Sequence, residues 1–567
     1  MAQALSRLMS TAWLLLLGAL LLFAEGCLSP AARPLIYQQT VLPREQIGTL
    51  ILTSVDTDFS AHPQSREARL LRKFYLANAG QPAWIDKQGI SVAAWQLLVV
   101  LEAADQQGLS PQRYQPESLR ELLQPATDEF EPFLGWPAAQ VAQVDIALSR
   151  AFFRYAGDNL WGQERCWRSR SDWHRPSLDI DPVQLLSLAL ELDAMPSALR
   201  GLPSNQQGYS RLAKVMSRYR ELAVLGGWPK VSSGPTLHLG ESDYRVPQLR
   251  RRLWLEGDLN GDMPVGEVYD LALQRGVQKF QKRHGLTPDG TLGPRSLQAL
   301  NVSVEQRIEQ ILRNMERWRW ENNRSDHAEI RINLAAFSLE VTDGERALFS
   351  MPVVIGRQER STPLFASKIE SLIFSPYWYV PPTLLREALA RITIDPAYLR
   401  RNHYEVLDPE GKLLQVGRNF SRKWQQGEVE ASLRQQPGPW NPMGDIKFPL
   451  SNSWSIYLHD TPRKELFSRT QRAFSSGCIR LSQPRKLASW LLGPSGWQPE
   501  EIDGLVDSGN SRMIQLEKPV ELSIGYWTAW VDDAGRINFR DDVYGRDQQL
   551  ARELRQSPVR IAGILPD

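Results

Sequence analysis

Two short stretches in the last third of the chain decide its fold: Ile-Tyr-Leu-His-Asp-Thr at 456–461 and Ser-Ser-Gly-Cys-Ile-Arg-Leu at 475–481. The first is strand-like and brings His459 to the end of a strand, whereas the second places Cys478 in a Ser-Gly turn. Strand ends and turns expose side chains to a substrate. Gly477 allows a sharp bend, after which backbone N–H groups can face a developing oxyanion.

The residue types at these positions suit nucleophilic catalysis. The thiolate is the reactive form of cysteine, and a neighbouring base or cation favours it. His459 can take the thiol proton of Cys478 if the two are adjacent, and Arg480 falls on the same face of an extended segment as the cysteine. The spacing alone leaves a plainer alternative open, in which the cysteine is a buried apolar residue and the histidine a surface residue.

Strand-like patterns surround these two stretches. The predicted strands lie at 329–341, 348–355, 368–380, 446–448 and 455–458, with a final pair at 520–531 and 537–539. Asp343-Gly344 is a tight-turn signal. Residues 381–401 have a helical pattern and 402–445 an irregular one, which interrupts the strands. We therefore predict a β-rich domain over 328–550 with an inserted cap at about 383–440.

The N-terminal part of the chain has a helical pattern. Apolar residues recur there at three- and four-residue spacing, which is typical of amphipathic helices. The clearest segments are 67–76, 91–104, 139–155 and 182–195. Another such helix at 302–320 follows later in the chain. The sequence predicts a helical scaffold over 45–240 that is continued by 301–326, so that the fold class is multidomain α+β.

Residues 241–300 form a compact segment between these helical parts. Phe280-Gln281, Gly285-Leu286 and the Asp-Gly-Thr-Leu-Gly run at 289–293 predict three short helices joined by Gly-Asp turns around a small core. This string resembles the peptidoglycan-binding domain that accompanies cell-wall enzymes. A three-helix spacer that binds nothing has the same fold and remains the alternative.

The first 26 residues have the pattern of an export signal. Arg7 precedes an apolar run at 12–24, which small residues follow. The run is shorter than the ~20 apolar residues of a membrane span. Cys27 directly after Gly26 raises lipidation as an alternative to cleavage or an uncleaved anchor. We expect the protein to work in the periplasm, either released or anchored to the membrane.

Composition limits the partners and cofactors. The 66 basic and 64 acidic residues are interspersed and give a net charge of +2, which argues against nucleic acid as a main partner. The three cysteines, Cys27, Cys166 and Cys478, lie far apart, and no metal-binding motif is present. Cys166 and Cys478 could pair in an oxidising compartment, or Cys478 stays free because it reacts.

The motifs around Cys478 resemble the active site of the L,D-transpeptidase catalytic domain of the YkuD type. Further matches follow in order along the chain: Val354–Arg357, Thr362–Pro363, Ser375–Pro382, Pro437–Pro439 and Tyr457–Pro462. With the helical scaffold and the small module, nearly the whole mature chain is similar to the large multidomain L,D-transpeptidases of Gram-negative bacteria.

The resemblance implies a role for each matching residue. Cys478 matches the nucleophile of the family, His459 its base, and Arg480 an arginine that is needed for activity and anchors substrate. The N–H groups of Gly477 and Cys478 would bind the oxyanion. In the family a backbone carbonyl just after the histidine orients the imidazole. Asp460 stands at that place, so either its carbonyl or its carboxylate would orient His459.

Three further positions are candidates for substrate binding. Ser476 stands where many members of the family have histidine, although the subgroup of large multidomain members commonly has serine. Tyr457 and Trp378 are candidates for the wall of the substrate groove, or else they belong to the aromatic core of neighbouring strands. The resemblance implies no metal and no organic cofactor, and carbapenem-type β-lactams as covalent inhibitors.

The implied activity is L,D-transpeptidation that forms 3→3 cross-links in peptidoglycan biosynthesis and so supports cell shape. Cys478 would attack a tetrapeptide donor stem at the L-centre of diaminopimelate, release D-alanine, and pass the acyl group from a thioester to a second stem. A peptidoglycan hydrolase of the same fold and a non-catalytic peptidoglycan-binding protein are the alternatives. The acceptor, whether a second stem, a lipoprotein lysine or water, stays open.

Overall fold

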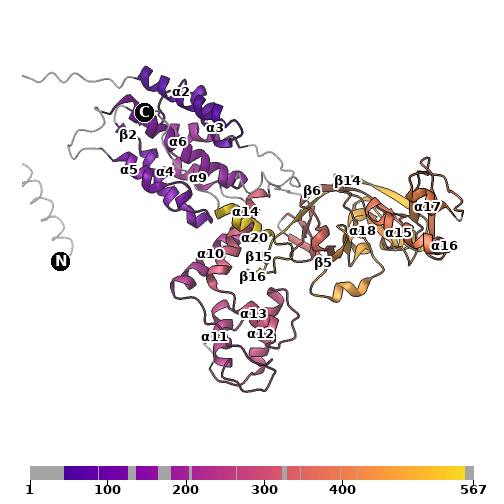
Figure 1. The fold of residues 1–567 in the computed structure, drawn as a ribbon. Helices are drawn as coiled ribbons and strands as arrows, with labels where there is room; N and C mark the ends of the chain where they lie inside the picture. The colour runs from indigo at the N-terminus through magenta and orange to yellow at the C-terminus, as the bar shows by residue number, and fades with distance from the viewer. Residues whose placement is uncertain are drawn as a thin grey trace, which may run out of the picture.

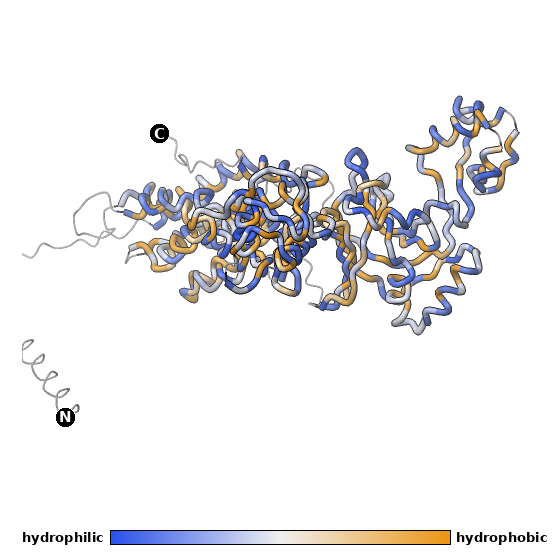
Figure 2. The backbone as a smooth tube through the Cα atoms, turned by 90° about the horizontal axis from the view of Figure 1, so that it is seen from below, coloured by the Kyte–Doolittle hydropathy of each residue, from blue (hydrophilic) through white to orange (hydrophobic). Residues whose placement is uncertain are grey.

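The computed structural model describes most of the chain after residue 43: residues 44–86, 89–124, 136–163, 180–202, 207–262, 265–321, 328–344, 346–395, 397–417 and 419–555. A helical scaffold, a small helical module and a β-rich domain form three parts, and the cap extends from the β-rich domain away from the other two (Figure 1). Figure 2 shows the same projection from below. The predicted export signal, Cys27 and Cys166 lie outside the described residues. None of the described helices is long and apolar enough to span a bilayer.

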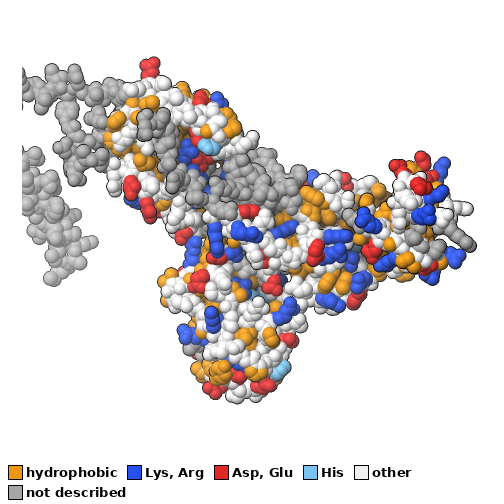
Figure 3. Space-filling model, in the orientation of Figure 1, with side chains coloured by type: hydrophobic (Ala, Val, Ile, Leu, Met, Phe, Trp, Pro, Cys, Tyr) orange, Lys and Arg blue, Asp and Glu red, His pale blue; other side chains and the backbone are white. Residues whose placement is uncertain are grey.

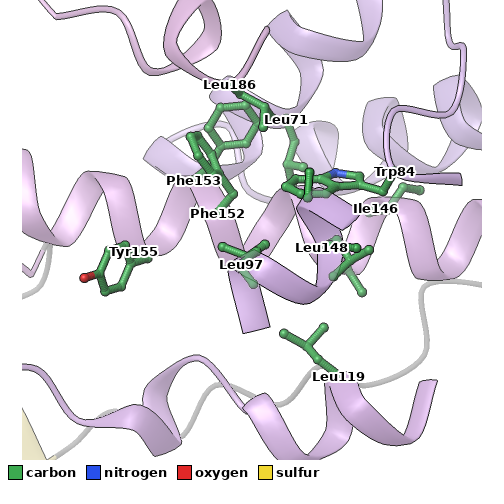
Figure 4. Packing of buried hydrophobic residues seen from close by; sticks show 14 of the residues in the cluster. Leu71, Trp84, Leu97, Leu119, Ile146, Leu148, Phe152, Phe153, Tyr155 and Leu186 are labelled. Atoms are coloured by element: carbon green, nitrogen blue, oxygen red, sulfur yellow. The ribbon is translucent and has the colours of Figure 1, made fainter. Parts of the chain in front are cut away.

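A long buried helix organises the scaffold. α6 (Ala138–Trp161) is enclosed along most of its length, and Figure 4 shows Phe152 and Phe153 of this helix among side chains such as Leu97 and Leu186. The surrounding elements are α2 (Arg44–Ala61), α3 (Arg66–Ala77), β1 (Ile85–Asp86), β2 (Gly89–Ile90), α4 (Val92–Glu102), η1 (Ala104–Gln107), η2 (Pro111–Arg113), α5 (Pro116–Leu123), α8 (Pro182–Glu191) and α9 (Met195–Arg200). The helices predicted at 67–76, 91–104 and 139–155 are therefore present.

The predicted helix at 182–195 is wrong at its C-terminal end. α8 stops at Glu191, and Asp193 adopts the left-handed conformation with a φ of 48°. A left-handed residue commonly ends a helix, and α9 then starts at Met195. Apolar periodicity continues across this break, so it gave no signal for the change of direction.

Two helices connect the scaffold to the small module. α10 (Gln207–Val224) and α14 (Val304–Trp320) pack against each other, with Leu212 and Met315 in their shared core. A capping box at Ser303 and Gln306 begins α14. The chain thus enters the module after α10 and returns along α14, as the insertion predicted from the sequence requires.

The module consists of three short helices around its own apolar core. They are α11 (Val246–Glu256), α12 (Leu271–Arg283) and α13 (Pro294–Leu300). Leu249 and Phe280 lie in the centre of the core. The side chain of Gln281 donates a hydrogen bond to Asp289 at 2.7 Å and accepts one from the N–H of Gly290 at 2.8 Å. The Phe-Gln and Asp-Gly motifs therefore fix the loop between α12 and α13.

The β-rich domain is built on a nine-stranded sheet that closes on itself. Its order is β12-β5-β13-β11-β10-β6-β14-β3-β4, and a further pairing joins β4 to β5. The strands are β3 (Ala328–Asn333), β4 (Ser338–Asp343), β5 (Arg346–Gly356), β6 (Phe365–Phe374), β10 (Ile446–Phe448), β11 (Leu458–His459), β12 (Ala473–Ser475), β13 (Ile479–Leu481) and β14 (Arg512–Gly525). Helices α18 (Pro484–Leu492) and α19 (Pro499–Asp507) contribute to the same core, and the short helices η3 (Gln358–Arg360), η4 (Lys464–Ser468) and η5 (Gly493–Ser495) lie between these elements. Alternate residues of each strand fill the inside of the closed sheet.

Several predicted strands are wrong in their boundaries. The segment 368–380 is divided, because β6 ends at Phe374 and β7 (Trp378–Tyr379) belongs to another sheet, and within 455–458 only Leu458 is in a strand, β11. The segment 329–341 is divided between β3 and β4 by a turn in which Phe337 has a φ of 54°. The segment 520–531 is also divided, because β14 ends at Gly525 and β15 (Ala529–Val531) begins a separate sheet. β15 pairs only with β16 (Ile537–Phe539), and this hairpin packs on α10 and α14 instead of in the main sheet.

The cap has more regular structure than the irregular pattern at 402–445 predicts. Its elements are β7 (Trp378–Tyr379), α15 (Pro382–Ile394), α16 (Tyr398–Arg401), β8 (Tyr404–Leu407), α17 (Phe420–Gln425) and β9 (Ser432–Gln435). The three strands form one sheet in the order β7-β9-β8. Leu389, Val406 and Leu433 belong to a core of the cap that is separate from that of the main sheet.

The surface agrees with the balanced composition. Figure 3 shows acidic, basic and hydrophobic side chains intermixed on the face in view, without one uniformly basic region. The net charge of the whole chain is +2.

Candidate active site

Neighbouring strands bring the predicted nucleophile and base to one face of the sheet. β11 and β13 run parallel, with Leu458 opposite Ile479 and His459 opposite Arg480. Leu458 and Ile479 are fully buried inside the sheet. Because side chains alternate between faces, His459, Arg480 and Cys478 belong to the opposite, outer face. Neighbouring strands lie about 4.8 Å apart, so side chains that face the same way on β11 and β13 are next to one another.

His459 is a buried, neutral imidazole. Burial first, and the charge of Arg480 second, lower the pKa of His459 to about 3, while the backbone at Asp460 and Met443 opposes this shift. Its Nδ1 has no hydrogen-bond partner among the residues that the structure describes. Near pH 7 such a side chain is unprotonated, and it gains a proton when negative charge develops beside it.

Cys478 is a free, half-buried cysteine. Burial raises the pKa of its thiol, and Tyr457, Lys447 and Arg480 lower that pKa in part. Its Sγ lies 3.8 Å from the backbone oxygen of Ser455. The resting thiol is therefore protonated near neutral pH, and the surrounding cations reduce the cost of ionising it.

The turn before Cys478 is closed by hydrogen bonds. Gly477 has a φ of 124°, and its N–H donates to Oγ of Ser475 at 3.0 Å. The Ser475 hydroxyl in turn donates to the carbonyl of Cys478 at 2.6 Å. Thr362, which is fully buried, donates from Oγ1 to the carbonyl of Gly477 at 2.7 Å.

This hydrogen bonding changes the expectation for the oxyanion site. The N–H of Gly477 is already used by Ser475, so it is not available to a second acceptor in this structure. The N–H of Cys478 donates no hydrogen bond to any described residue. Of the two donors predicted from the sequence, Cys478 is the one that remains open to an oxyanion.

Asp460 directly follows the base and is buried. Its carboxylate accepts a hydrogen bond from the N–H of Asp445 at 3.0 Å and pairs with the ammonium of Lys464. Its own N–H donates to the carbonyl of Ile446 at 2.9 Å. The carboxylate is thus occupied away from His459, on which it is the backbone of Asp460 that acts.

Arg480 and Ser476 flank the nucleophile. Burial, and then the charge of Arg463, lower the pKa of Arg480, and its Nε is buried without a hydrogen-bond partner in the described part of the chain. Arg480 also has no carboxylate within ion-pair distance among those residues. Ser476 is exposed and lies 3.4 Å from the guanidinium of Arg360. Arg480 therefore keeps its charge available to an incoming anion.

The two aromatic candidates have different surroundings. The ring of Tyr457 meets that of His459 edge to face, with centroids 5.6 Å apart, so Tyr457 belongs to the group around the nucleophile. Trp378 is in β7 of the cap, opposite Gln435 of β9, and its ring lies 6.3 Å from that of Tyr404. The structure thus packs Tyr457 against His459, whereas Trp378 packs against residues of the cap.

Lys447 is a member of this group that the sequence did not indicate. It is opposite His459 in the pairing of β10 with β11, and its Nζ lies 4.1 Å from the centre of the Tyr457 ring. Burial lowers the pKa of Lys447, whereas the nearby Cys478 raises it. The only signal in the sequence was its place between the apolar Ile446 and Phe448, which directs it to the outer face.

A cavity of about 660 Å³ lies elsewhere, between α10, α14, β3, β4 and the β15–β16 hairpin. Its charged side chains are partly paired with one another, as Arg331 with Glu329 and Arg211 with Asp533. Trp318 and Trp527 in its wall stack on each other. No cysteine or histidine lines it. This cavity therefore does not offer the cysteine–histidine pair that the face around Cys478 carries.

Comparison with protein families assigns three parts of the chain. A family described as "L,D-transpeptidase catalytic domain" matches residues 327–520. A "Scaffold domain" matches 69–216, and a "Putative peptidoglycan binding domain" matches 242–300. The matches follow the same order as the scaffold, the module and the closed sheet.

Individual proteins with similarity carry the same name. A "Putative L,D-transpeptidase" from Haemophilus influenzae is 32% identical over 228 residues, which cover 40% of this chain and 45% of the relative. The chain thus aligns with somewhat less than half the length of this curated relative. A solved L,D-transpeptidase from Stackebrandtia nassauensis is 13% identical, with 52% of this chain and 98% of that chain covered and a TM-score of 0.21.

A second solved structure is L,D-transpeptidase 3 from Mycobacterium tuberculosis with a faropenem-derived adduct, at 16% identity and a TM-score of 0.16, covering 35% of this chain and 59% of that one. At such values the assignment rests on the family matches and not on these two structures. The chain contains a catalytic domain of the YkuD L,D-transpeptidase family, preceded by a scaffold domain and a peptidoglycan-binding domain.

Proposed function

We propose that this protein is a cysteine L,D-transpeptidase that forms 3→3 cross-links between peptidoglycan stems. The observation that carries the proposal is the placement of Cys478, His459 and Arg480 on one face of adjacent parallel strands. The thiol, a neutral base and an unpaired cation are the groups that acyl transfer from an anionic peptide needs. The match of residues 327–520 to an L,D-transpeptidase catalytic domain supports the proposal.

Acylation begins with attack of the Cys478 sulfur on the carbonyl at the L-centre of diaminopimelate in a tetrapeptide donor. The thiol proton passes to His459, which is neutral before the reaction. The N–H of Cys478 donates to the oxyanion of the tetrahedral intermediate. When the intermediate collapses, the C–N bond breaks, His459 returns its proton to the leaving amine, and D-alanine departs with a thioester left on the enzyme.

The second step transfers the acyl group to an amine. The side-chain amine of a second stem attacks the thioester carbonyl, His459 takes the amine proton, and the Cys478 thiol is restored. The backbone carbonyl of Asp460 orients His459 during both steps, since its carboxylate is held by Asp445 and Lys464. Arg480 anchors a carboxylate of the stem.

The cap supports the choice of amine over water. Its separate core and its own sheet make it a discrete body next to the catalytic sheet. Covering the thioester excludes water and shapes the groove for the acceptor stem. Tyr457 forms part of the wall of this groove, and the exposed Ser476 lies at its edge.

The proposal extends to the place where the protein works, which is the cell wall. The N-terminal segment directs the protein to the periplasm, where the small module holds it on peptidoglycan. Carbapenem-type β-lactams acylate Cys478, because their strained amide carbonyl is an electrophile that the same thiol attacks. No metal or organic cofactor takes part in the proposed steps.

Two measurements on the full chain test the proposal. Intact-mass spectrometry after incubation with a carbapenem should show one covalent adduct, which Cys478→Ala abolishes and the control Cys166→Ala retains. Incubation with purified disaccharide-tetrapeptide should give cross-linked dimers and free D-alanine. Tripeptide without dimer would instead make the protein a hydrolase. An absence of both adduct and product would make it a non-catalytic binding protein.

A further inference from the structure

Lys447 occupies an unusual position beside the proposed nucleophile. It is the middle residue of β10, between Ile446 and Phe448, both of which are fully buried inside the sheet. Alternation therefore places Lys447 on the outer face, where it lies between Ile373 of β6 and His459 of β11 in the strand pairing. A lysine at this place stands in the row of side chains that continues through His459 to Arg480.

The ammonium group of Lys447 has an aromatic neighbour and no acidic one. Its Nζ lies 4.1 Å from the centre of the Tyr457 ring, within the range of a cation–π interaction. No Asp or Glu pairs with it in the described part of the chain. Removing a cation from water without an anionic partner is unfavourable, so the site retains this charge at a cost in stability. The positive charge of Lys447 would be balanced by an anion that forms beside it only during the reaction.

Cys478 is the group that can supply that anion. The two residues act on each other: the charge of Lys447 lowers the pKa of the Cys478 thiol, and Cys478 raises the pKa of Lys447. Of the two cations that favour the thiolate, Lys447 has a larger effect than Arg480. The same two cations lower the pKa of His459, which keeps the base unprotonated until the thiol gives up its proton.

We propose that Lys447 is a positioning residue of the active site, whose ammonium group, held over the ring of Tyr457, stabilises the thiolate of Cys478. The inference rests on the proposed role of Cys478 as the nucleophile. It assigns to β10 a part in activating a cysteine that directly precedes β13, through the ladder of strands β10, β11 and β13. A thiolate formed next to this cation costs less than one formed next to His459 alone.

Other charged groups face the site and have to be held constant in a test. His459 comes from β11, Tyr457 from the residue before Leu458 of that strand, and Arg480 from β13. Arg463 and Glu465, near η4, act on Arg480 and not on the thiol directly. Arg360 of η3 reaches Ser476. None of these side chains is replaced in a Lys447 variant, and His459, with a pKa of about 3, stays neutral over the pH range in which a thiol titrates. A shift in the ionisation of Cys478 therefore reports on the ammonium group.

The test is the pH dependence of Cys478 alkylation by iodoacetamide in the full chain without substrate, followed by the mass of the peptide that contains Cys478. In Lys447→Met the midpoint of the alkylation rate should move up by about one pH unit, which lowers the rate at pH 7 about tenfold. Lys447→Arg should keep the midpoint of the unaltered protein. Lys368→Met, which removes an exposed strand lysine paired with Glu521, is the matched control and should leave it unchanged.

An unchanged midpoint in Lys447→Met would overturn the proposal, and so would a normal midpoint combined with a raised KM for the tetrapeptide, which would make Lys447 a substrate anchor. Lys447→Gln provides a second neutral variant in case the methionine disturbs folding, and thermal melts check both. Iodoacetamide is uncharged and needs no acceptor. The titration therefore stands even for a protein that proves to make no cross-links.

Discussion

At the scale of single residues, the nucleophile and the base are held by different means. His459 is fixed by strand pairing, with Lys447 on one side and Arg480 on the other. Cys478 follows a turn that depends on side-chain hydrogen bonds from Ser475 and Thr362. A strand is stabilised by its whole sheet, whereas the turn depends on a few bonds and is more sensitive to single substitutions.

Thr362 shows this sensitivity most directly. Its Oγ1 donates to the carbonyl of Gly477 at 2.7 Å and accepts from the N–H of Gly356 at 3.0 Å. In Thr362→Val both backbone groups lose a buried partner, which should lower the free energy of unfolding by about 1–3 kcal/mol and kcat about tenfold or more. Thr362→Ser keeps the hydroxyl and should restore most of kcat. Equal kcat in the valine and serine variants would contradict this role.

The low pKa of His459 makes stability depend on pH. The ordinary pKa of 6.5 applies to the unfolded chain and a value of about 3 to the folded one. Below pH 6.5 the unfolded state binds more protons, so the folded state loses stability as the pH falls from 6.5 towards 3. Burial also lowers the pKa of His284, which adds to the loss of stability in acid. The contribution of His459 is therefore measured as a difference between variants.

Between pH 7 and pH 5, the free energy of unfolding should fall by about 2 kcal/mol less in His459→Gln than in the unaltered protein. Denaturant unfolding at the two pH values measures this difference. The matched control is His62→Gln, because His62 is exposed on the scaffold. If His459→Gln showed the same loss between pH 7 and pH 5 as the unaltered protein, the imidazole would not be held neutral by its surroundings.

Alternation within one short segment was sufficient to predict that Cys478 and Arg480 share a face. The sequence left open whether His459 is adjacent to them, because that depends on the pairing of β11 with β13. Lys447 depends on the pairing of β10 with β11, which only the assembled sheet defines. The use of the Gly477 N–H by Ser475 also lay beyond the pattern, since a hydroxyl can turn towards several acceptors. The motif around Trp378 made it a candidate for the wall of the substrate groove. Its contact with Tyr404 depends on the fold of the cap, which the sequence pattern did not show.

At the scale of elements, the cap is the part that the sequence described least well. Its strands β8 and β9 are four residues each and carry charged side chains such as Glu405 and Arg434, which pair across the sheet. Such short, polar strands have no strong alternation, so the segment looked irregular. Its two ends come together where Nδ2 of Asn441 donates to the carbonyl of Pro376 at 2.9 Å.

That closure allows the cap to be removed cleanly. Replacing residues 378–439 by a short Gly-Ser linker joins two points that are already close in space. The shortened enzyme should still form the carbapenem adduct, but it should release more tripeptide relative to cross-linked dimer, because water then reaches the thioester. Chromatography of the products from disaccharide-tetrapeptide measures the ratio.

Asn441→Ala with the cap intact is the companion variant, since it removes the bond that closes the cap and leaves the cap in place. It should raise the share of tripeptide less than the deletion does. An unchanged ratio of tripeptide to dimer in the deletion would show that the cap does not control access of water.

At the scale of the whole molecule, the end of the chain connects the catalytic sheet to the scaffold. After β14 the chain leaves the sheet and forms the β15–β16 hairpin on α10 and α14, and the last described element is α20 (Arg546–Arg555) beside α14. Thr528 accepts a hydrogen bond from the Asn314 side chain and donates one to Asp547. The sequence at 520–531 looks like one strand because the apolar pattern continues through the point at which the partner changes.

The buried ion pair between Arg317 of α14 and Asp547 of α20 should be the most important single contact of this connection. Their side chains are 2.6 Å apart and less than a tenth exposed. Asp547→Ala leaves Arg317 buried without its partner, which should lower the free energy of unfolding by about 3–5 kcal/mol. The exposed pair of Arg536 with Asp532 in the same hairpin is the control, and Arg536→Ala should cost less than about 1 kcal/mol.

A double-mutant cycle then separates the pair from the packing around it. Arg317→Met combined with Asp547→Ala should cost less than the sum of the two single changes, because no buried charge is left unpaired. Denaturant unfolding measures all four proteins, and alkylation of Cys478 in the folded state should keep the same midpoint throughout, since neither residue is among those around the thiol. Strict additivity of the two substitutions would show that the pairing of Arg317 with Asp547 adds no stability of its own to this connection.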